Sequence, residues 1–334
     1  MKKTALIGAI TLAATGAANA QLQIYGLLDA SYGKSLFASA FLNEKADFHS
    51  GGDNGNSEGN SVTRFGLKGS TDVGSGIKAN FKLESNGITS DGAVNGSFFG
   101  RQAWLGFSGA FGEVRLGRQD SVPFQTMADF DFNGFSNGVS ALGYSLVGPW
   151  LPGRQSRSLQ YITPTFSGVT AQVGVVPKGN RGDTAKAVLS GGVKYAGGPF
   201  AAAVSFQTKD DENTENFASV AGSYDLGVAK FMLGYADGGK FADGGTGHGP
   251  SFGVTVPVAG FNIGGLYGQN LDDDLKIKSV EFFINKEVLK NTYAYFEAGN
   301  WKTSLAANPL ADPVDFPNAK TKGTAYAIGV IYVF

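Results

Sequence analysis

The sequence predicts an all-β chain that closes into a transmembrane antiparallel β-barrel of 16 strands. Three observations carry this prediction. Glycine accounts for 50 of the 334 residues, aromatic residues for 12% and charged residues for only 16%. This mixture disfavours a helical bundle, where each glycine costs about 1 kcal/mol, and suits strands. Several segments alternate apolar and polar residues with the period of two that strands have, and short and long connections take turns along the chain.

The first twenty residues have the three parts of an export signal. Lys2 and Lys3 precede an apolar run from Ala5 to Ala14, and Ala18-Asn19-Ala20 is a small-x-small cleavage pattern. The apolar run is too short to cross a bilayer as a helix. We therefore expect residues 1–20 to be cleaved and a single barrel domain to span 21–334. Without the two lysines the basic residues fall from 27 to 25 against 28 acidic ones, a net charge of −3.

Alternation is plainest at the C-terminus. There Tyr326, Ile328, Val330, Tyr332 and Phe334 share one parity, with small residues among the positions between them. The segments 77–84, 169–175 and 200–207 follow the same pattern. A soluble β-sandwich alternates as well, so the connections decide between the two folds.

Short and long connections are expected to separate the strands in turn. Short turns are expected at 71–75, 109–112, 165–168, 196–199, 224–228, 257–260 and 285–289. Long connections are expected at 35–60, 86–97, 118–155, 178–184, 208–215, 237–250, 270–274 and 302–321. Together they join 16 strands, and an even number lets the first and last strands meet and remove the sheet edge. A barrel of this size encloses an aqueous lumen.

The long connection at 118–155 is expected to fold into the lumen. It carries many apolar side chains, among them Phe130, Leu142 and Trp150, and apolar surface left in water is costly. Folded inward, it narrows the lumen. The acidic side of that constriction would then consist of Asp120, Asp129 and Asp131. Packing on a neighbouring subunit and an extracellular lid are the alternatives.

Positive charges gather on the strands that flank this connection. All seven arginines lie between residues 64 and 181. Because a charge that faces lipid at mid-depth costs about 2–4 kcal/mol, we expect these side chains to face the lumen or its rim. The predicted basic side of the constriction consists of Arg64, Lys68, Lys78, Lys82, Arg101, Arg115 and either Arg154 or Arg157. The direction of Arg101 is open, since Ala103 and Leu105 share its parity. The alternative for each of these residues is ordinary solvated charge without a role in selectivity.

No catalytic, cofactor or metal site is predicted. His49 and His248 are the only histidines, both in glycine-rich segments without a second histidine at i+4. There is no cysteine for a thiol nucleophile, a disulfide or a zinc thiolate site. The triplet Asp272-Asp273-Asp274 could hold a divalent cation, but such a triplet is more often a solvated turn. No basic excess exists to attract nucleic acid.

Six blocks resemble Gram-negative general porins of the beta-proteobacterial and neisserial branch. They are Gln21–Asp29, Thr63–Gly69, Phe99–Gly106, Leu116–Gln119, Ser158–Pro164 and the terminal Phe334. The resemblance implies a trimeric outer-membrane diffusion porin whose third loop folds into the lumen. It implies constriction arginines at Arg64, Arg101 and one of Arg154 and Arg157. It also implies subunit contacts through the first and last strands and the second loop (86–97), and an assembly signal at Phe334 that the barrel-assembly machinery reads. Outer-membrane lipids and lipopolysaccharide would surround the barrel.

The expected function is a water-filled channel for small hydrophilic solutes and ions. The net charge of −3 would favour cations, but selectivity is set in the narrowest section, where low-dielectric walls focus the field. Charges on distant loops are screened beyond about 10 Å in 0.1 M salt. Glu84 and Glu113 are not expected to reach that section, so about seven cations face three loop acids and favour anions modestly. The alternatives are a surface interaction barrel of the adhesin type with a closed lumen and a substrate-specific uptake channel.

Overall fold

The computed structural model describes residues 21–145, 153–179, 186–209, 215–240, 246–311 and 313–334. The expected export signal (1–20) and Trp150 lie outside these residues, so cleavage after Ala20 stays a prediction. Of the helices in the described part of the chain, none is long and apolar enough to cross a membrane.

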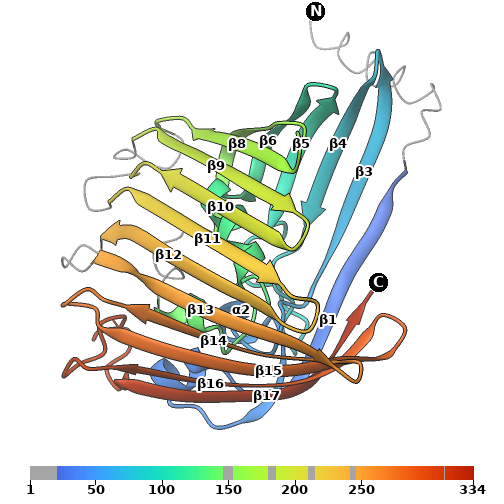
Figure 1. Cartoon of the computed structure of the whole chain (residues 1–334). Helices are drawn as coiled ribbons and strands as arrows, with labels where there is room; N and C mark the ends of the chain where they lie inside the picture. Colours follow the sequence, from blue (N-terminus) through green and yellow to red (C-terminus); the bar gives the residue numbers. More distant parts are fainter. Residues whose placement is uncertain (1–20, 146–152, 180–185, 210–214, 241–245, 312) are drawn as a thin grey trace, which may run out of the picture.

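Sixteen of the described strands form one closed antiparallel barrel (Figure 1). They are β1 (Gln23–Lys34), β3 (Arg64–Gly74), β4 (Ile77–Glu84), β5 (Gln102–Gly109), β6 (Gly112–Asp120), β7 (Arg154–Ile162), β8 (Val169–Val176), β9 (Val188–Gly197), β10 (Phe200–Gln207), β11 (Phe217–Asp225), β12 (Lys230–Lys240), β13 (Thr246–Val258), β14 (Phe261–Asn270), β15 (Ile277–Leu289), β16 (Thr292–Thr303) and β17 (Lys322–Val333). Each pairs with its neighbour in sequence, and β1 pairs with β3 near its start and with β17 along the rest of its length. The predicted fold class is confirmed.

The seventeenth strand of the sheet, β2 (Asp47–Ser50), belongs to the first loop and not to the barrel wall. It pairs with Ala30–Gly33 in the second half of β1. The first loop, residues 35–63, also holds η1 (Ala38–Leu42) and α2 (Asp53–Asn56). The sequence pattern at 35–60 therefore predicted the connection but none of its internal structure.

The alternating pattern separates a lipid-facing from a lumen-facing side. On β17, Ile328 is 58% exposed, whereas Ala325 is fully buried. On β10, Val204 and Phe206 are exposed and Ser205 is buried, as the parity predicts. Apolar side chains that would be buried in a soluble protein thus cover the outside of the barrel.

The strands are longer than the predicted connections allow in several places. Strand β12 runs to Lys240 and β13 begins at Thr246, within the connection predicted at 237–250, and β3 runs to Gly74, within the turn predicted at 71–75. Strand β15 runs to Leu289, so the turn to β16 lies at 290–291 and not at 285–289. The pairing register of β15 shifts between Glu287 and Leu289. This irregularity disturbs the alternation from which the turn was predicted, and the strand therefore seemed to end too early.

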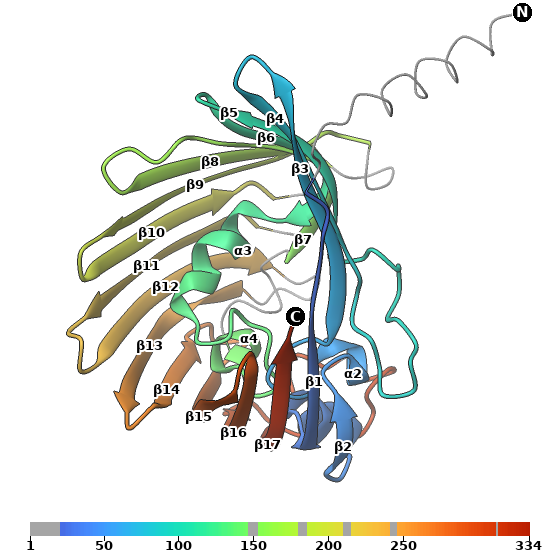
Figure 2. The same cartoon turned by 90° about the vertical axis from the view of Figure 1, so that its right-hand side faces the viewer.

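The described part of the third loop, residues 121–145 and 153, lies inside the barrel, as predicted (Figure 2). It contains α3 (Val122–Met127), η2 (Ala128–Phe130) and α4 (Ala141–Ser145). The side chain of Ser121 begins α3 by accepting a hydrogen bond from the backbone N–H of Phe124 at 3.1 Å, a typical N-cap. Met127, Phe130 and Leu142 are buried against inward side chains of four strands: Ala203, Phe217, Ala221, Ala236 and Leu266. Full burial of a Met, Phe or Leu side chain stabilises the folded protein by about 1.5–3 kcal/mol. This packing therefore holds the loop against the barrel wall.

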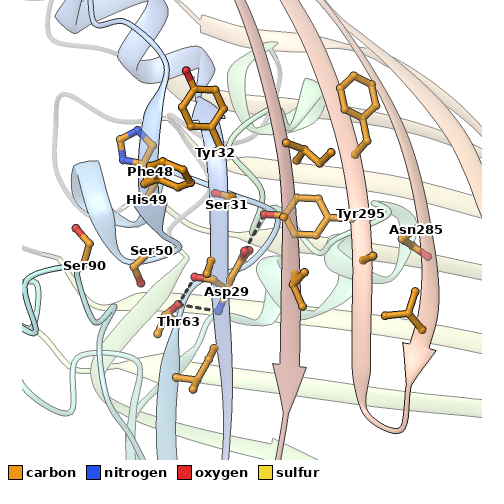
Figure 3. Close-up of a pocket in the computed structure, with 18 of the residues that line it drawn as sticks. Asp29, Ser31, Tyr32, Phe48, His49, Ser50, Thr63, Ser90, Asn285 and Tyr295 are labelled. Atoms are coloured by element: carbon orange, nitrogen blue, oxygen red, sulfur yellow. Dashed lines mark hydrogen bonds between the residues drawn. The ribbon is translucent and has the colours of Figure 1, made fainter.

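The first loop ties the third loop to the wall at a second place. The backbone N–H of Leu36 donates to the carbonyl of Gly138, whose own N–H donates to the carbonyl of Gly59, both at 2.8 Å. Nearby, the Asp29 carboxylate accepts a hydrogen bond from the Tyr295 hydroxyl at 2.7 Å (Figure 3). It accepts another from the Ser61 N–H at 2.6 Å. These bonds join β1, the end of the first loop and β16 into one unit.

Candidate pore constriction

Glu84, the last residue of β4, lies at the centre of a group of cations. Its carboxylate is 2.7 Å from Nε of Arg101, 3.2 Å from Nζ of Lys82 and 3.8 Å from Nε of Arg64. The Tyr25 hydroxyl donates a hydrogen bond to the same carboxylate at 2.7 Å. With only 4% of its surface exposed, Glu84 compensates part of the positive charge that surrounds it. The expectation that Glu84 stays away from this section was wrong.

Strand register and one glycine bring these groups together. Tyr25 on β1 lies directly opposite Gly66 on β3, which in turn lies opposite Glu84 on β4. A Cβ atom at Gly66 would lie 2.5 Å from the Tyr25 ring, so only glycine leaves room for the ring to lie across the strand. The ring then reaches the Glu84 carboxylate.

Arg101 points into the lumen although its parity is that of outward residues. Strand β5 begins only at Gln102, so Arg101 lies just before the regular pairing between β4 and β5. Its backbone N–H donates to the Glu84 carbonyl at 3.3 Å. Alternation therefore does not govern this position. The ion pair with Glu84 turns the side chain inward.

The neck of the third loop is closed by an ion pair between its two flanking strands. Asp120 ends β6, Arg154 begins β7, and the two are register partners with Nε of Arg154 3.2 Å from the carboxylate of Asp120. The guanidinium also lies 5.8 Å from the centre of the Phe124 ring. Arg154 interacts electrostatically with Arg101 and Glu84, so it belongs to the same group. We call Arg64, Arg101 and Arg154 the arginine cluster.

Arg157 lies elsewhere. It is exposed, shares the outward parity of Leu159, and adopts a positive φ of 55° next to the register shift between β6 and β7. Of the two arginines that the sequence left open, Arg154 joins the cluster and Arg157 does not.

Three lysines continue the positive charge towards the short-turn end of the barrel. Lys68, Lys78 and Lys82 line a pocket of about 630 Å³ on the inner faces of β3 and β4. The ammonium groups of Lys68 and Lys82 lie 5.1 and 5.5 Å from the centre of the Tyr25 ring, a favourable cation–π geometry. We call these residues the lysine ladder. Only Lys82 also contacts Glu84, so Lys68 and Lys78 lie beside the cluster and not within it.

Arg115 lies between the two groups. It pairs with Glu113 at 2.6 Å and stacks on Trp104 with its guanidinium 4.6 Å from the ring centre. It also lines a small pocket of about 150 Å³ with Lys82 and Asp120. Its charge is partly compensated by its own acid partner.

The acids of the third loop do not form the opposing row that the sequence predicted. Asp120 pairs with Arg154, as described, and Asp129 pairs with Lys194 of β9 at 2.6 Å. Asp131 is only 6% exposed, and its carboxylate accepts hydrogen bonds from the N–H groups of Asn133 and Phe135, both at 3.0 Å. Burial raises the pKa of Asp131 above its usual value. The expectation for Asp131 was wrong, because its side chain holds a turn inside the loop instead of facing the lumen.

The aspartate triplet, which the sequence left open as a cation site, forms a turn. Asp272 accepts a hydrogen bond from the Asp274 N–H at 2.8 Å, and Asp273 pairs with Lys276 at 2.6 Å. No group of three metal-ligating side chains occurs among the residues that the structure describes.

Comparison with known proteins identifies the family. The sequence model of a family described as Gram-negative porin matches residues 4–306. The chain belongs to the Gram-negative porin family. The porin is 34% identical over 256 residues to outer membrane porin protein 32 of Delftia acidovorans, covering 69% of this chain and 68% of that protein. It is 31% identical over 318 residues to an outer membrane porin protein of Bordetella pertussis, covering 84% and 80% of the two chains.

A solved structure has the same fold. The anion-selective porin from Comamonas acidovorans matches with a TM-score of 0.76 and 23% identity, covering 94% of this chain and 100% of that chain. The porin is thus an outer-membrane β-barrel of a Gram-negative bacterium and forms a diffusion channel. Its family is one of channels and not of enzymes.

Beside Tyr25, Phe334 closes the seam between the first and last strands. Its N–H donates to the carbonyl of Gly26 at 3.1 Å, and the N–H of Gly26 donates back at 2.9 Å. A Cβ atom at Gly26 would lie 2.3 Å from the Phe334 ring, so the ring covers this glycine directly. Its role as an assembly signal stays a prediction.

Proposed function

We propose that the arginine cluster and the lysine ladder make this porin a passive channel with a modest preference for anions. The supporting observation is the balance of charge around Glu84 and Asp120. Arg64, Arg101, Arg154 and Lys82 surround these two acids, so the group keeps a net positive charge.

The third loop strengthens the effect of that charge. Its described helices pack against strands between β8 and β16, so we infer that the passage for ions runs beside the basic wall of β3 to β7. Within a narrow passage between low-dielectric walls, a small excess of fixed charge changes the local concentration of ions strongly. The solved structure with the same fold is that of an anion-selective porin, which agrees with the proposal.

Recordings from single channels in planar bilayers test the proposal. We expect steady ohmic steps of about nanosiemens size, as an aqueous barrel lumen allows. Reversal potentials across a KCl gradient should indicate chloride preference that grows as the salt concentration falls, because screening weakens. Cation preference would refute the charge assignment. Silent membranes would favour the adhesin-type alternative, and saturable block by a sugar or an organic acid would favour substrate-specific uptake.

We further propose that the porin is a homotrimer that associates through β1, β17 and the second loop (85–101). An apolar groove of about 1070 Å³ on the outer face supports this (Figure 3). Leu28 and Tyr32 of β1, Ile328 and Val330 of β17, and Ile88 of the second loop line it. A contiguous apolar groove beside a polar loop is typical of a protein–protein contact.

Native mass spectrometry in mild detergent is expected to detect assemblies of three copies. Replacing Ile88 by arginine should shift the distribution towards monomers, because the new charge would be buried at the contact without a partner. Val228→Arg, in an exposed short turn away from the groove, serves as the matched control and should leave the trimer intact. Monomers alone in the wild type would remove the proposal.

A further inference from the structure

The barrel wall has glycines where the third loop comes closest to it. A Cβ atom at Gly192 of β9 would lie 2.8 Å from Cγ2 of Thr126 and 3.0 Å from Cγ1 of Val122, both on α3. A Cβ atom at Gly299 of β16 would lie 2.9 Å from Cβ of Val139. Carbon atoms in contact are about 3.5–4.0 Å apart, so neither position has room for a methyl group. The loop therefore lies as near to these strands as their backbone allows.

Gly192 faces the lumen, whereas its neighbour Gly191 faces the lipid. Lys194, which has the parity of Gly192, pairs with Asp129 of the third loop at 2.6 Å. Val193, on the other parity, is 41% exposed. Apart from its neighbours in the chain, the nearest atom to a Cβ at Gly191 would be a backbone oxygen of β8 at 3.9 Å. A side chain would thus press on α3 from position 192 but not from position 191.

The side of α3 that lies on Gly192 is well defined. Val122 and Thr126 are four residues apart, so they share one side of the helix, and both are buried. The Thr126 hydroxyl donates to the carbonyl of Pro123 at 2.8 Å. This bond turns the hydroxyl to the helix backbone and leaves the methyl group to contact the wall.

Two ion pairs restrict how α3 can move. Asp120 and Arg154 hold the start of the loop, and Asp129 and Lys194 hold η2 to β9. Both pairs resist sliding along the wall, so a helix that is pushed from Gly192 moves away from the wall and into the lumen (Figure 2). Phe124, on another side of the helix, has its ring centre 5.8 Å from the guanidinium of Arg154. A displacement of α3 is therefore felt at the arginine cluster.

We propose that Gly192 sets the width of the passage for ions by fixing how far α3 projects into the lumen. The inference rests on the proposed function, which places that passage between the third loop and the basic wall. Gly192 contacts no ion and acts through α3, so it is a positioning residue. Any side chain at position 192 displaces α3 by roughly 0.5 Å or more, since carbon contacts of about 3 Å must lengthen to at least 3.5 Å. The passage then narrows in proportion to the size of the side chain.

Single-channel conductance and the exclusion of neutral polyethylene glycols test the proposal. Gly192→Ala is expected to lower the conductance by roughly a tenth to a quarter, and Gly192→Val by more, because groups inserted into a packed contact displace the backbone around it. The largest glycol that enters the channel should become smaller in the same order. Gly191→Ala and Gly191→Val add the same groups on the lipid-facing side of β9 and should leave both quantities at their wild-type values.

A compensating variant separates displacement of α3 from other effects of the substitution. V122A/T126S removes the methyl groups that a side chain at position 192 would meet, and it keeps the hydroxyl that bonds to Pro123. Combined with Gly192→Ala, it should restore the conductance of the wild type. Heat-modifiable mobility identifies folded variants, and Gly192→Ala, as the smaller change, carries the test if Gly192→Val does not fold.

Three results would overturn the proposal. They are wild-type conductance of the folded Gly192 variants, an equal loss of conductance in the Gly191 variants, and failure of V122A/T126S to restore the conductance of Gly192→Ala. Cation preference of the wild type would refute the proposed function instead. The order of conductances depends on the width of the passage and not on the sign of its charge, so it would still support the role of Gly192.

Discussion

Replacing Arg64 and Arg101 together by serine is expected to remove most of the anion preference of the porin. The two side chains supply half of the cationic groups around Glu84 and Asp120, and Lys82 and Arg154 would remain against those two acids. The local net charge would then be close to zero. Because the passage focuses the field of its fixed charges, the ratio of chloride to potassium permeability should fall towards 1, most visibly at low salt, and Lys68 and Lys78 account for the preference that remains. Reversal potentials across a KCl gradient measure it.

Two variants separate charge from other effects of the double substitution. R64K/R101K keeps both charges, so it should retain the preference if charge is responsible. R157S removes an arginine that is exposed on the outer parity, so it should leave the reversal potential unchanged. If R64S/R101S, folded as judged by heat-modifiable mobility, had the wild-type reversal potential, these arginines would not set the selectivity.

Deleting Phe334 is expected to lower the amount of folded porin in the outer membrane several-fold. The deletion removes both backbone hydrogen bonds to Gly26 and the ring that covers this glycine. The first and last strands would then meet with an open, unpaired end, and unpaired strand edges promote association with other chains. Abundance in outer-membrane fractions and the heat-modifiable shift in electrophoresis report the effect.

Phe334→Ala separates the ring from the backbone bonds, since alanine keeps the N–H and the carbonyl. If the ring acts as a signal for the assembly machinery, F334A should be depleted in cells yet refold in detergent with nearly the wild-type yield. If closure of the seam between β1 and β17 limits folding, the deletion variant should fold poorly both in cells and in detergent. Wild-type abundance and mobility of the deletion variant would contradict both explanations.

Alternation predicted the strands well wherever it is uninterrupted. On β10 and β17 the residue parity alone separated lipid-facing from lumen-facing side chains, because one face of each strand contacts lipid. Where an extra residue enters a strand, as between Glu287 and Leu289, parity changes and the turn was misplaced. Arg101 was ambiguous for a related reason, since it precedes β5 and is not subject to the alternation.

The sequence predicted which cationic side chains belong to the candidate site, but it did not predict which acidic side chains do. The lysines and arginines on the flanking strands follow from parity. Glu84 has the same parity as Lys82, so parity alone would also have placed it in the lumen. Asp131 could not be assigned from sequence, because its direction depends on the turn that its own carboxylate forms. Tyr25 was missed altogether, and its contact with Glu84 depends on the glycine opposite it.

The placement of the cations on one wall has a consequence for how ions share the passage. The lysine ladder and the arginine cluster follow one another along β3, β4 and the neighbouring strand ends, while the third loop forms the other wall. An anion entering from either side meets a new ammonium or guanidinium group before it has left the last one, and can exchange water for these contacts stepwise. Potassium ions gain nothing from this path. Anions should therefore stay close to this one wall during passage, and potassium ions should keep away from it.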